Sequence, residues 1–144
     1  IEEILFEGDT ITLLLSSETP LRPIGRSYHV TLTALEDATG RPIEGTALVG
    51  VSAESLADMT VFPNPFKPNA GDVTVAGLPL NASVTILSVA GEVVWRREEL
   101  DGNGGLNWDG RNGLGRPVAA GIYFVHVQDG SSTQLRKLAL IRGH

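Results

Sequence analysis

Cysteine is absent from this sequence of 144 residues, and histidine is scarce. The first absence excludes disulfide frameworks, thiolate metal sites and cysteine nucleophiles together. The three histidines, His29, His126 and His144, have no second histidine or carboxylate at metal-ligand spacing, so we expect exposed strand or tail positions for them. No G-x-S-x-G motif and no acid–base pair can be named either. The sequence therefore predicts a chain that is not an enzyme.

Long apolar runs and an excess of basic residues are also missing. No apolar run approaches the roughly 18 residues that span a bilayer, so no transmembrane segment is predicted. The net charge of −6 disfavours general binding to nucleic acid or anionic membranes. The charge is uneven, because residues 1–60 carry 10 acidic and 3 basic side chains, whereas residues 61–144 carry 7 and 8. The two parts of the chain therefore look like different units.

Apolar patterns with a helical period are essentially missing, whereas period-two alternation runs along most of the chain. Turn residues such as those at 37–42 recur about every ten residues. Many short strands separated in this way are typical of an antiparallel β-sandwich, so the predicted fold class is all-β. The expected strands are residues 10–15, 27–35, 46–53, 72–76, 82–89, 92–99, 121–129 and 133–142.

A proline cluster, Pro63, Pro65 and Pro68, interrupts this pattern. Proline lacks an amide donor and is excluded from central strands, so the cluster indicates an edge strand or a boundary. The change in charge falls at the same place. We therefore expect two Ig-like sandwich modules in tandem, residues 1–58 and residues 59–144, joined through this stiff segment.

The second module carries a series of motifs in a fixed order. The first are PNPF at Pro63, Asn64, Pro65 and Phe66, LP at 78–79, and V-x-I-x-x-x-x-G, which ends at Gly91. Next come WDG at Trp108, Asp109 and Gly110, and G-x-P-V-x-x-G-x-Y-F, which includes Gly121 and Tyr123. The last is RKLALIR at 136–142, which includes Lys137. This series resembles the C-terminal sorting domain of type IX secretion cargo proteins. It is also similar to the Ig-like module of flagellar hook-capping proteins.

The resemblance implies a role in export. A domain of this family is recognised by the type IX machinery of the outer membrane, which would place the protein at the cell surface or outside the cell. The motif residues and the last strand around Lys137 would be family positions, without a catalytic or cofactor-binding site. The pair Gly143-His144 extends past the family's usual apolar-basic end.

The first module looks incomplete. Residues 10–48 resemble the second half of a bacterial Ig-like or fibronectin-III-like module, but about 58 residues are too few for seven strands. Half a sandwich would leave an apolar face and an edge open. We expect the missing strands either upstream in a longer, processed chain, in keeping with a start at Ile1, or in a neighbouring subunit by strand donation.

Three smaller features bear on binding. Asp101, Asn103, Asn107 and Asp109 are spaced like calcium ligands, but a Gly/Asn hairpin loop is the main prediction because Gly105 and Asn112 break the pattern. Trp95, among exposed arginines, indicates either a partly buried aromatic or a sugar-binding face. Residues 98–101, with Glu98, Glu99 and Asp101, are expected to form a solvated strand end.

The sequence thus favours a non-catalytic C-terminal region of a large exported bacterial protein, comprising a spacer and a sorting domain. Any catalytic domain would lie upstream. One alternative is a structural subunit of a surface layer or filament, completed by a neighbour's strand. Another is a carbohydrate-binding accessory module.

Overall fold

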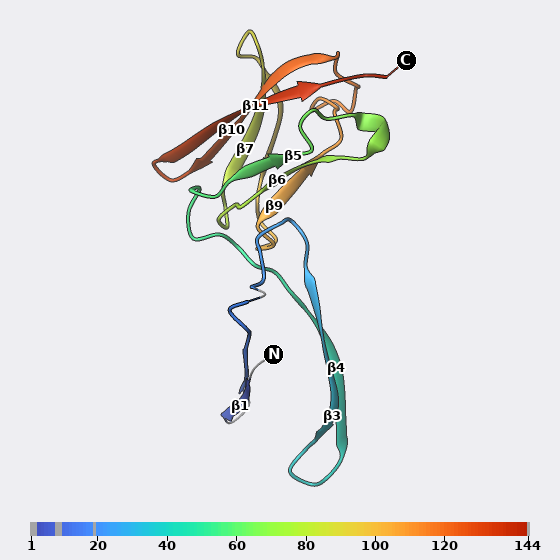
Figure 1. Cartoon of the computed structure of the whole chain (residues 1–144), viewed down its shortest axis with the longest axis vertical. Coiled ribbons are helices and arrows are strands. Elements are labelled where there is room, and N and C mark those ends of the chain that lie inside the picture. Colours follow the sequence, from blue (N-terminus) through green and yellow to red (C-terminus); the bar gives the residue numbers. More distant parts are fainter. Residues whose placement is uncertain (1–2, 8–9, 19, 144) are drawn as a thin grey trace.

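The computed structural model describes residues 3–7, 10–18 and 20–143. Figure 1 shows a β-sandwich at one end and two β-hairpins hanging from it, with the C-terminus at the end far from the hairpins. Regular structure is almost entirely β, which confirms the predicted fold class. The described ranges contain no helix long and apolar enough to cross a membrane.

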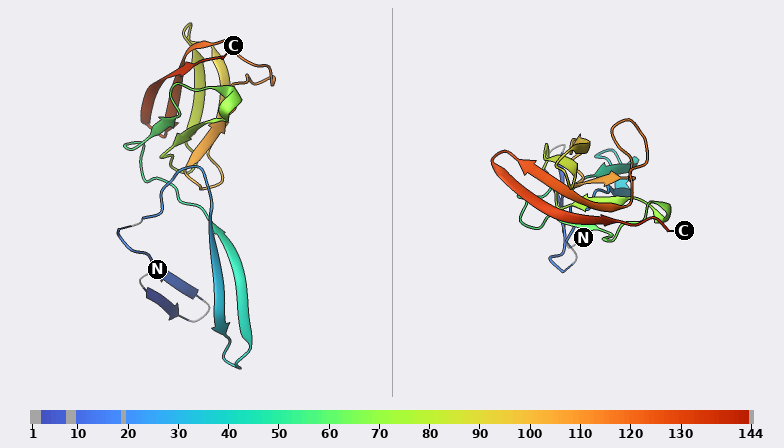
Figure 2. Two further views of the ribbon diagram at one scale, coloured as in Figure 1. Left: turned by 45° about the vertical axis from the view of Figure 1, so that its right-hand side comes forward. Right: turned by 90° about the horizontal axis from the view of Figure 1, so that it is seen from above.

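The N-terminal part forms two separate antiparallel hairpins. The first pairs β1 (Glu3–Glu7) with β2 (Thr10–Leu14), and the second pairs β3 (Tyr28–Glu36) with β4 (Pro42–Val49). Figure 2 shows them as distinct ribbons below the sandwich. Each hairpin is a two-stranded sheet of its own, and no described side chain before Leu56 is fully buried.

One face of the β3–β4 hairpin is more apolar than the other. Tyr28, Val30 and Leu32 alternate along β3 and are half-buried, while the residues between them are exposed. The predicted alternation is therefore present, but among the described strands β3 and β4 pair only with each other. The division at residue 58 stays a prediction.

The C-terminal part is a sandwich of two antiparallel sheets. One sheet has the order β11-β10-β7-β8 and the other the order β5-β6-β9. The strands are β5 (Thr60–Phe62), β6 (Val73–Ala76), β7 (Ser83–Ser88), β8 (Val93–Glu98), β9 (Gly105–Trp108), β10 (Gly121–Asp129) and β11 (Ser132–Leu140), and a single 3-10 turn, η1 (Pro68–Ala70), follows β5.

The core lies between these two sheets. It is built from alternate residues of the strands, such as Val84 and Ile86 of β7 and Val125 and Val127 of β10, all with no exposed surface. Leu56, which precedes the expected boundary, is also buried in this core. Because β-branched and aliphatic side chains fill both inner faces, burial of the core holds the two sheets together.

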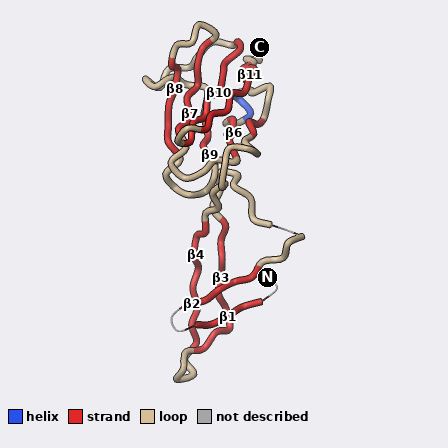
Figure 3. The backbone as a smooth tube through the Cα atoms, turned by 90° about the vertical axis from the view of Figure 1, so that its left-hand side faces the viewer, coloured by secondary structure: helices blue, strands red, loops and turns tan. Residues whose placement is uncertain are grey.

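Several predictions about elements differ from the structure. The strand expected at residues 46–53 is β4, which runs from Pro42 to Val49, and β1 was not expected. No strand was expected between residues 99 and 121, yet β9 lies there and pairs with β6. The proline cluster was expected to mark an edge strand or a boundary, and it follows edge strand β5. Residues 64–66 bond to β11, so this segment does not itself connect the hairpins to the sandwich. Figure 3 shows that two other loop segments, which precede β3 and follow β4, connect the hairpin to the sandwich.

Candidate functional site

The PNPF motif is fastened to the outer edge of the last strand. Asn64 Nδ2 donates to the Lys137 carbonyl at 2.8 Å, and Asn64 Oδ1 accepts from the Ala139 amide at 3.1 Å. The Phe66 amide donates to the Ala139 carbonyl at 2.7 Å, and the Ile141 amide donates to the Phe66 carbonyl at 2.9 Å. Residues 64–66 thus bond to backbone groups of Lys137, Ala139 and Ile141, which would otherwise be unpaired along the outer edge of β11 and just after its end.

A cluster of three aromatic side chains explains why motifs far apart in the sequence occur together. Trp108 is 1% exposed, and its ring centroid lies 5.8 Å from those of both Phe66 and Tyr123. Its indole Nε1 donates to the Arg111 carbonyl at 2.6 Å, so its only polar atom is satisfied. The cluster therefore ties the PNPF motif, β9 and β10 to one point in the core.

Tyr123 also fixes the chain before β10. Its hydroxyl donates to the Ala119 carbonyl at 2.8 Å, four residues upstream. Burial raises the pKa of the Tyr123 hydroxyl above its ordinary value, while the charge of Arg142 acts in the opposite direction. This contact is the local tie expected of a tyrosine corner.

The other motif residues lie at turns. Gly91 has a φ of +82° and closes the β7–β8 turn by donating to the Ser88 carbonyl. A Cβ on Gly110 would stand 3.1 Å from the Phe66 ring, so glycine permits that close approach. The Asp109 carboxylate accepts from the Arg111 amide at 3.0 Å, and Gly121 opens β10 opposite Leu140.

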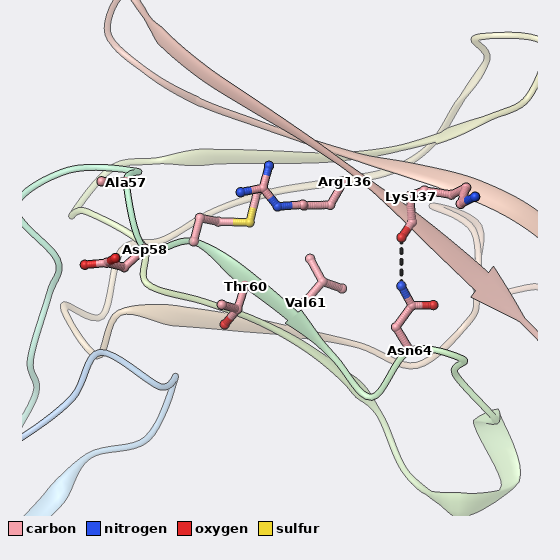
Figure 4. A pocket seen from close by; sticks show the side chains of 8 residues that line it. Ala57, Asp58, Thr60, Val61, Asn64, Arg136 and Lys137 are labelled. Carbon is pink, nitrogen blue, oxygen red and sulfur yellow. Dashed lines mark hydrogen bonds between the residues drawn. The ribbon is translucent and has the colours of Figure 1, made fainter.

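A hollow of about 580 Å³ lies beside this motif, between β5 and β11. Figure 4 shows Arg136 and Lys137 on one wall and Asp58, Thr60 and Val61 on the other, with the Asn64–Lys137 bond at one end. Lys137 is exposed, whereas Leu138 next to it is buried. In the last strand the Lys137 side chain therefore lies at the surface, whereas Leu138 and Leu140 pack in the core.

Sequence reasoning missed Arg136 as a wall of this hollow. Arg136 shares a face of β11 with Leu138 and Leu140, since side chains alternate along a strand. Continuing that alternation beyond the core would have placed it here. Its guanidinium donates to Gln134 Oε1 at 2.8 Å and to the Leu135 carbonyl at 3.1 Å.

The predicted solvated strand end is wrong for one residue. Glu99 has no exposed surface, and its Oε1 accepts from the amides of Asp101 at 3.1 Å and Asn103 at 3.3 Å. Its backbone also pairs with Asn81 and Ala82, which draws it into the sandwich. Glu98 and Asp101 are exposed, as expected.

Asn103 and Asn107, two of the four candidate calcium ligands, accept hydrogen bonds within the protein. Asn103 Oδ1 accepts from the Gly105 amide at 3.2 Å, and Asn107 Oδ1 accepts from Thr74 Oγ1 at 2.8 Å. In the described part of the chain no three His, Cys, Asp or Glu side chains are grouped to hold a metal ion. The preference for a Gly/Asn hairpin loop over a calcium site stays a prediction of the sequence.

The histidines and Trp95 have the following positions. His29 is exposed, as expected. The exposed position expected for His126 is wrong, because it lies on the central strand β10, on the face opposite Tyr123, and is half-buried between β11 and β7. His144 lies outside the described residues. Trp95 is half-buried against the core and borders two hollows of about 480 and 320 Å³.

Comparison with known proteins gives a family and a solved relative. A family model described as "Secretion system C-terminal sorting domain" matches residues 60–141. The structure is similar to PorZ, described as an essential bacterial surface component of the type-IX secretion system of Porphyromonas gingivalis, with 35% identity and a TM-score of 0.55. That match covers 63% of this chain and 12% of PorZ.

Two further solved structures are more distant. Dimeric latent PorU from Porphyromonas gingivalis has 19% identity and a TM-score of 0.42, over 83% of this chain and 12% of PorU. The BSP domain of a biofilm associated protein has 13% identity and a TM-score of 0.44, over 81% of this chain and 19% of that one. None of the curated proteins compared with the chain matches it.

The family match covers more than half of the chain and begins and ends with the sandwich. It includes the PNPF motif, the aromatic cluster and the last strand. This family is a non-catalytic sorting tail, which marks proteins that are secreted or carried to the cell surface. The chain belongs to the family of C-terminal sorting domains of the type IX secretion system.

Proposed function

We propose that the type IX secretion machinery of the outer membrane recognises the folded sandwich by binding its last strand and the hollow between β5 and β11. The observation that supports this most directly is the Asn64 contact with Lys137 and Ala139, since it joins the first and last family motifs into one surface. In this proposal the upstream hairpins are an Ig-like spacer. The whole chain is the C-terminal region of a larger exported bacterial protein, whose other activities lie upstream.

An export assay tests this proposal. The whole chain is fused behind a reporter with an ordinary signal peptide, in a host that has type IX secretion. We compare the intact fusion with Lys137→Ala, which removes an exposed charge, and with a deletion of residues 133–144. Lys67→Ala is the matched control, because Lys67 is also an exposed lysine.

The expected result is reporter at the surface or in the medium for the intact fusion and for Lys67→Ala. Export should fall several-fold for Lys137→Ala and be lost for the deletion. The deletion also removes the core residues Leu138 and Leu140, so the point variant carries the argument about recognition. If the intact fusion stays in the periplasm, the sorting role is refuted. If both lysine variants are exported equally, recognition through Lys137 is refuted.

A second function is favoured by the open edges of the β3–β4 hairpin. Tyr28, Val30 and Leu32 lie on a sheet of two strands, and no other described strand pairs with either edge of it. A neighbouring subunit that donated a strand to this hairpin would make the chain a surface-layer or filament component. Light scattering over a hundredfold range of concentration distinguishes the cases, because this role requires assembly and a monomer at all concentrations excludes it.

A further inference from the structure

The end of the sandwich nearest the hairpins receives two connecting segments. One connector, residues 20–26, precedes β3, and the other, residues 50–53, follows β4. The Gly77 amide donates to the Pro23 carbonyl at 2.8 Å, and the Gly25 amide donates to the Asn103 carbonyl at 3.0 Å. The Ala53 amide donates to the Leu78 carbonyl at 3.0 Å. Both connectors are thus bonded by their backbones to the sandwich.

Glycines make this contact unusually close. A Cβ on Gly50 would overlap the Gly102 carbonyl oxygen, and a Cβ on Gly104 would overlap both Pro23 and the Val51 carbonyl oxygen. A Cβ on Gly105 would stand 2.7 Å from the Gly25 Cα. In each case the obstacle is largely backbone, which a flexible side chain cannot relieve by moving. The connectors and the sandwich are therefore packed main chain against main chain.

The loop that receives the connectors is itself held from within. Glu99 is completely buried and its Oε1 accepts the amides of Asp101 and Asn103, at the start of this loop. The Leu78 amide donates to the Gly104 carbonyl at 3.0 Å, which joins the loop to the segment after β6. Residues 77–78 and 99–105 together form what we call the glycine socket.

We infer that the glycine socket is a docking surface for the two connectors, so that the β3–β4 hairpin and the sandwich move as one body. The folded unit of the sorting tail then begins near residue 20, about 40 residues before the family match starts at residue 60. A partner that binds the sandwich would therefore also fix the orientation of the β3–β4 hairpin relative to that partner. This inference does not depend on whether the machinery reads the last strand.

Hydrogen exchange with Gly50→Ala tests the inference. Gly50 has an ordinary φ, so alanine there introduces only the overlap with Gly102. Gly45→Ala is the matched control, because Gly45 also has an ordinary φ and nothing lies within 4 Å of its Cβ position. We expect the amides of Gly25, Ala53 and Gly77 to exchange about tenfold faster or more in Gly50→Ala, and unchanged in Gly45→Ala. Equal exchange in both variants would overturn the inference.

A distance measurement tests the rigid orientation separately. The absence of cysteine allows one spin label at His29→Cys, at the base of β3, and another at Thr133→Cys, on β11. Both positions are exposed. The expected result is a narrow distance distribution in the otherwise unaltered chain and a broader one in Gly50→Ala. A broad distribution in the unaltered chain would overturn the inference. Neither measurement involves secretion, so its outcome is independent of the export assay.

Discussion

At the scale of single residues, the Asn64 side chain makes two hydrogen bonds to β11 of the kind that a neighbouring strand would make. Its side-chain amide carries a donor and an acceptor, as a backbone peptide does, and uses both on β11. An aspartate would keep the acceptor for Ala139 but would set a carboxylate oxygen against the Lys137 carbonyl. Asparagine is therefore the residue type that fits both contacts at once.

Replacing Asn64 by alanine should destabilise the sandwich. Two hydrogen bonds to β11 are lost, so we expect the free energy of unfolding to fall by about 1–2 kcal/mol. Chemical denaturation measures this change. Asn69→Ala is the control, since Asn69 is an exposed asparagine in the nearby turn η1 and its replacement should change stability by less than about 0.5 kcal/mol. Equal stability of the two variants would mean that the Asn64 contacts contribute nothing.

Glu99 allows a comparison between two substitutions. Glutamine keeps an acceptor for the amides of Asp101 and Asn103 and places an amide nitrogen where Oε2 now has no hydrogen-bond partner. Alanine leaves both amides without their acceptor and creates a cavity, so it should lower the free energy of unfolding by about 2–4 kcal/mol, and glutamine by much less. Thermal unfolding of the two variants gives the order. A glutamine variant as unstable as the alanine variant would show that an acceptor at this position is not sufficient.

The residue scale also shows where sequence reasoning succeeds and fails. The motif residues Trp108 and Tyr123 both lie in the core, since large aromatics in a small sandwich have few other places to go. Burial of Glu99 was missed because it depends on amides brought in by the loop that follows it. A charged residue at a strand end has no sequence signal for such a partner.

At the scale of elements, alternation located most strands well. The strand expected at residues 121–129 is β10 with the same limits, since Gly121 and Asp129 bound an uninterrupted alternating run. β9 was missed because glycine and asparagine dominate Gly105–Trp108 and its neighbours. Here Gly105 is required by the close approach of Gly25, so a tertiary contact overrides the local preference for a loop.

The turn between β3 and β4 should weaken in acid. The Asp37 carboxylate accepts from the hydroxyl and amide of Thr39 and from the amide of Arg41, and these bonds lower the pKa of Asp37 below 3.8. A folded pKa below the unfolded value means that the stabilisation is present above pH 3.8 and is lost as the pH falls through the lower folded value.

NMR chemical shifts of the Thr39 and Arg41 amides, followed from pH 6 to pH 2, measure this loss. We expect both amides to report one transition below pH 3.8. Asp37→Asn should remove that transition because asparagine does not titrate. A transition that persists in the variant would assign the pH dependence to another group.

At the scale of the whole molecule, two parts of the sandwich make different contacts. The far end joins the PNPF motif to the last strand, and the near end holds the connectors in the glycine socket. The sequence contains the motifs of the first arrangement, but their order along the chain did not predict the contact between them. It could not predict the second, because single glycines in connectors look like ordinary turn residues until their backbone neighbours are known.

The socket makes a prediction about fragments. Residues 54–143 keep the core residues Leu56 and Met59 but lack both connectors, whereas residues 20–143 keep both connectors. Three backbone hydrogen bonds and the packing around Gly104 and Gly105 are absent from the shorter fragment. We therefore expect its Tm to be lower by roughly 5–10 °C in calorimetry. Limited proteolysis should cut it first within residues 99–105. If the two fragments melt together, the connectors only touch the sandwich, and the sorting domain is complete without them.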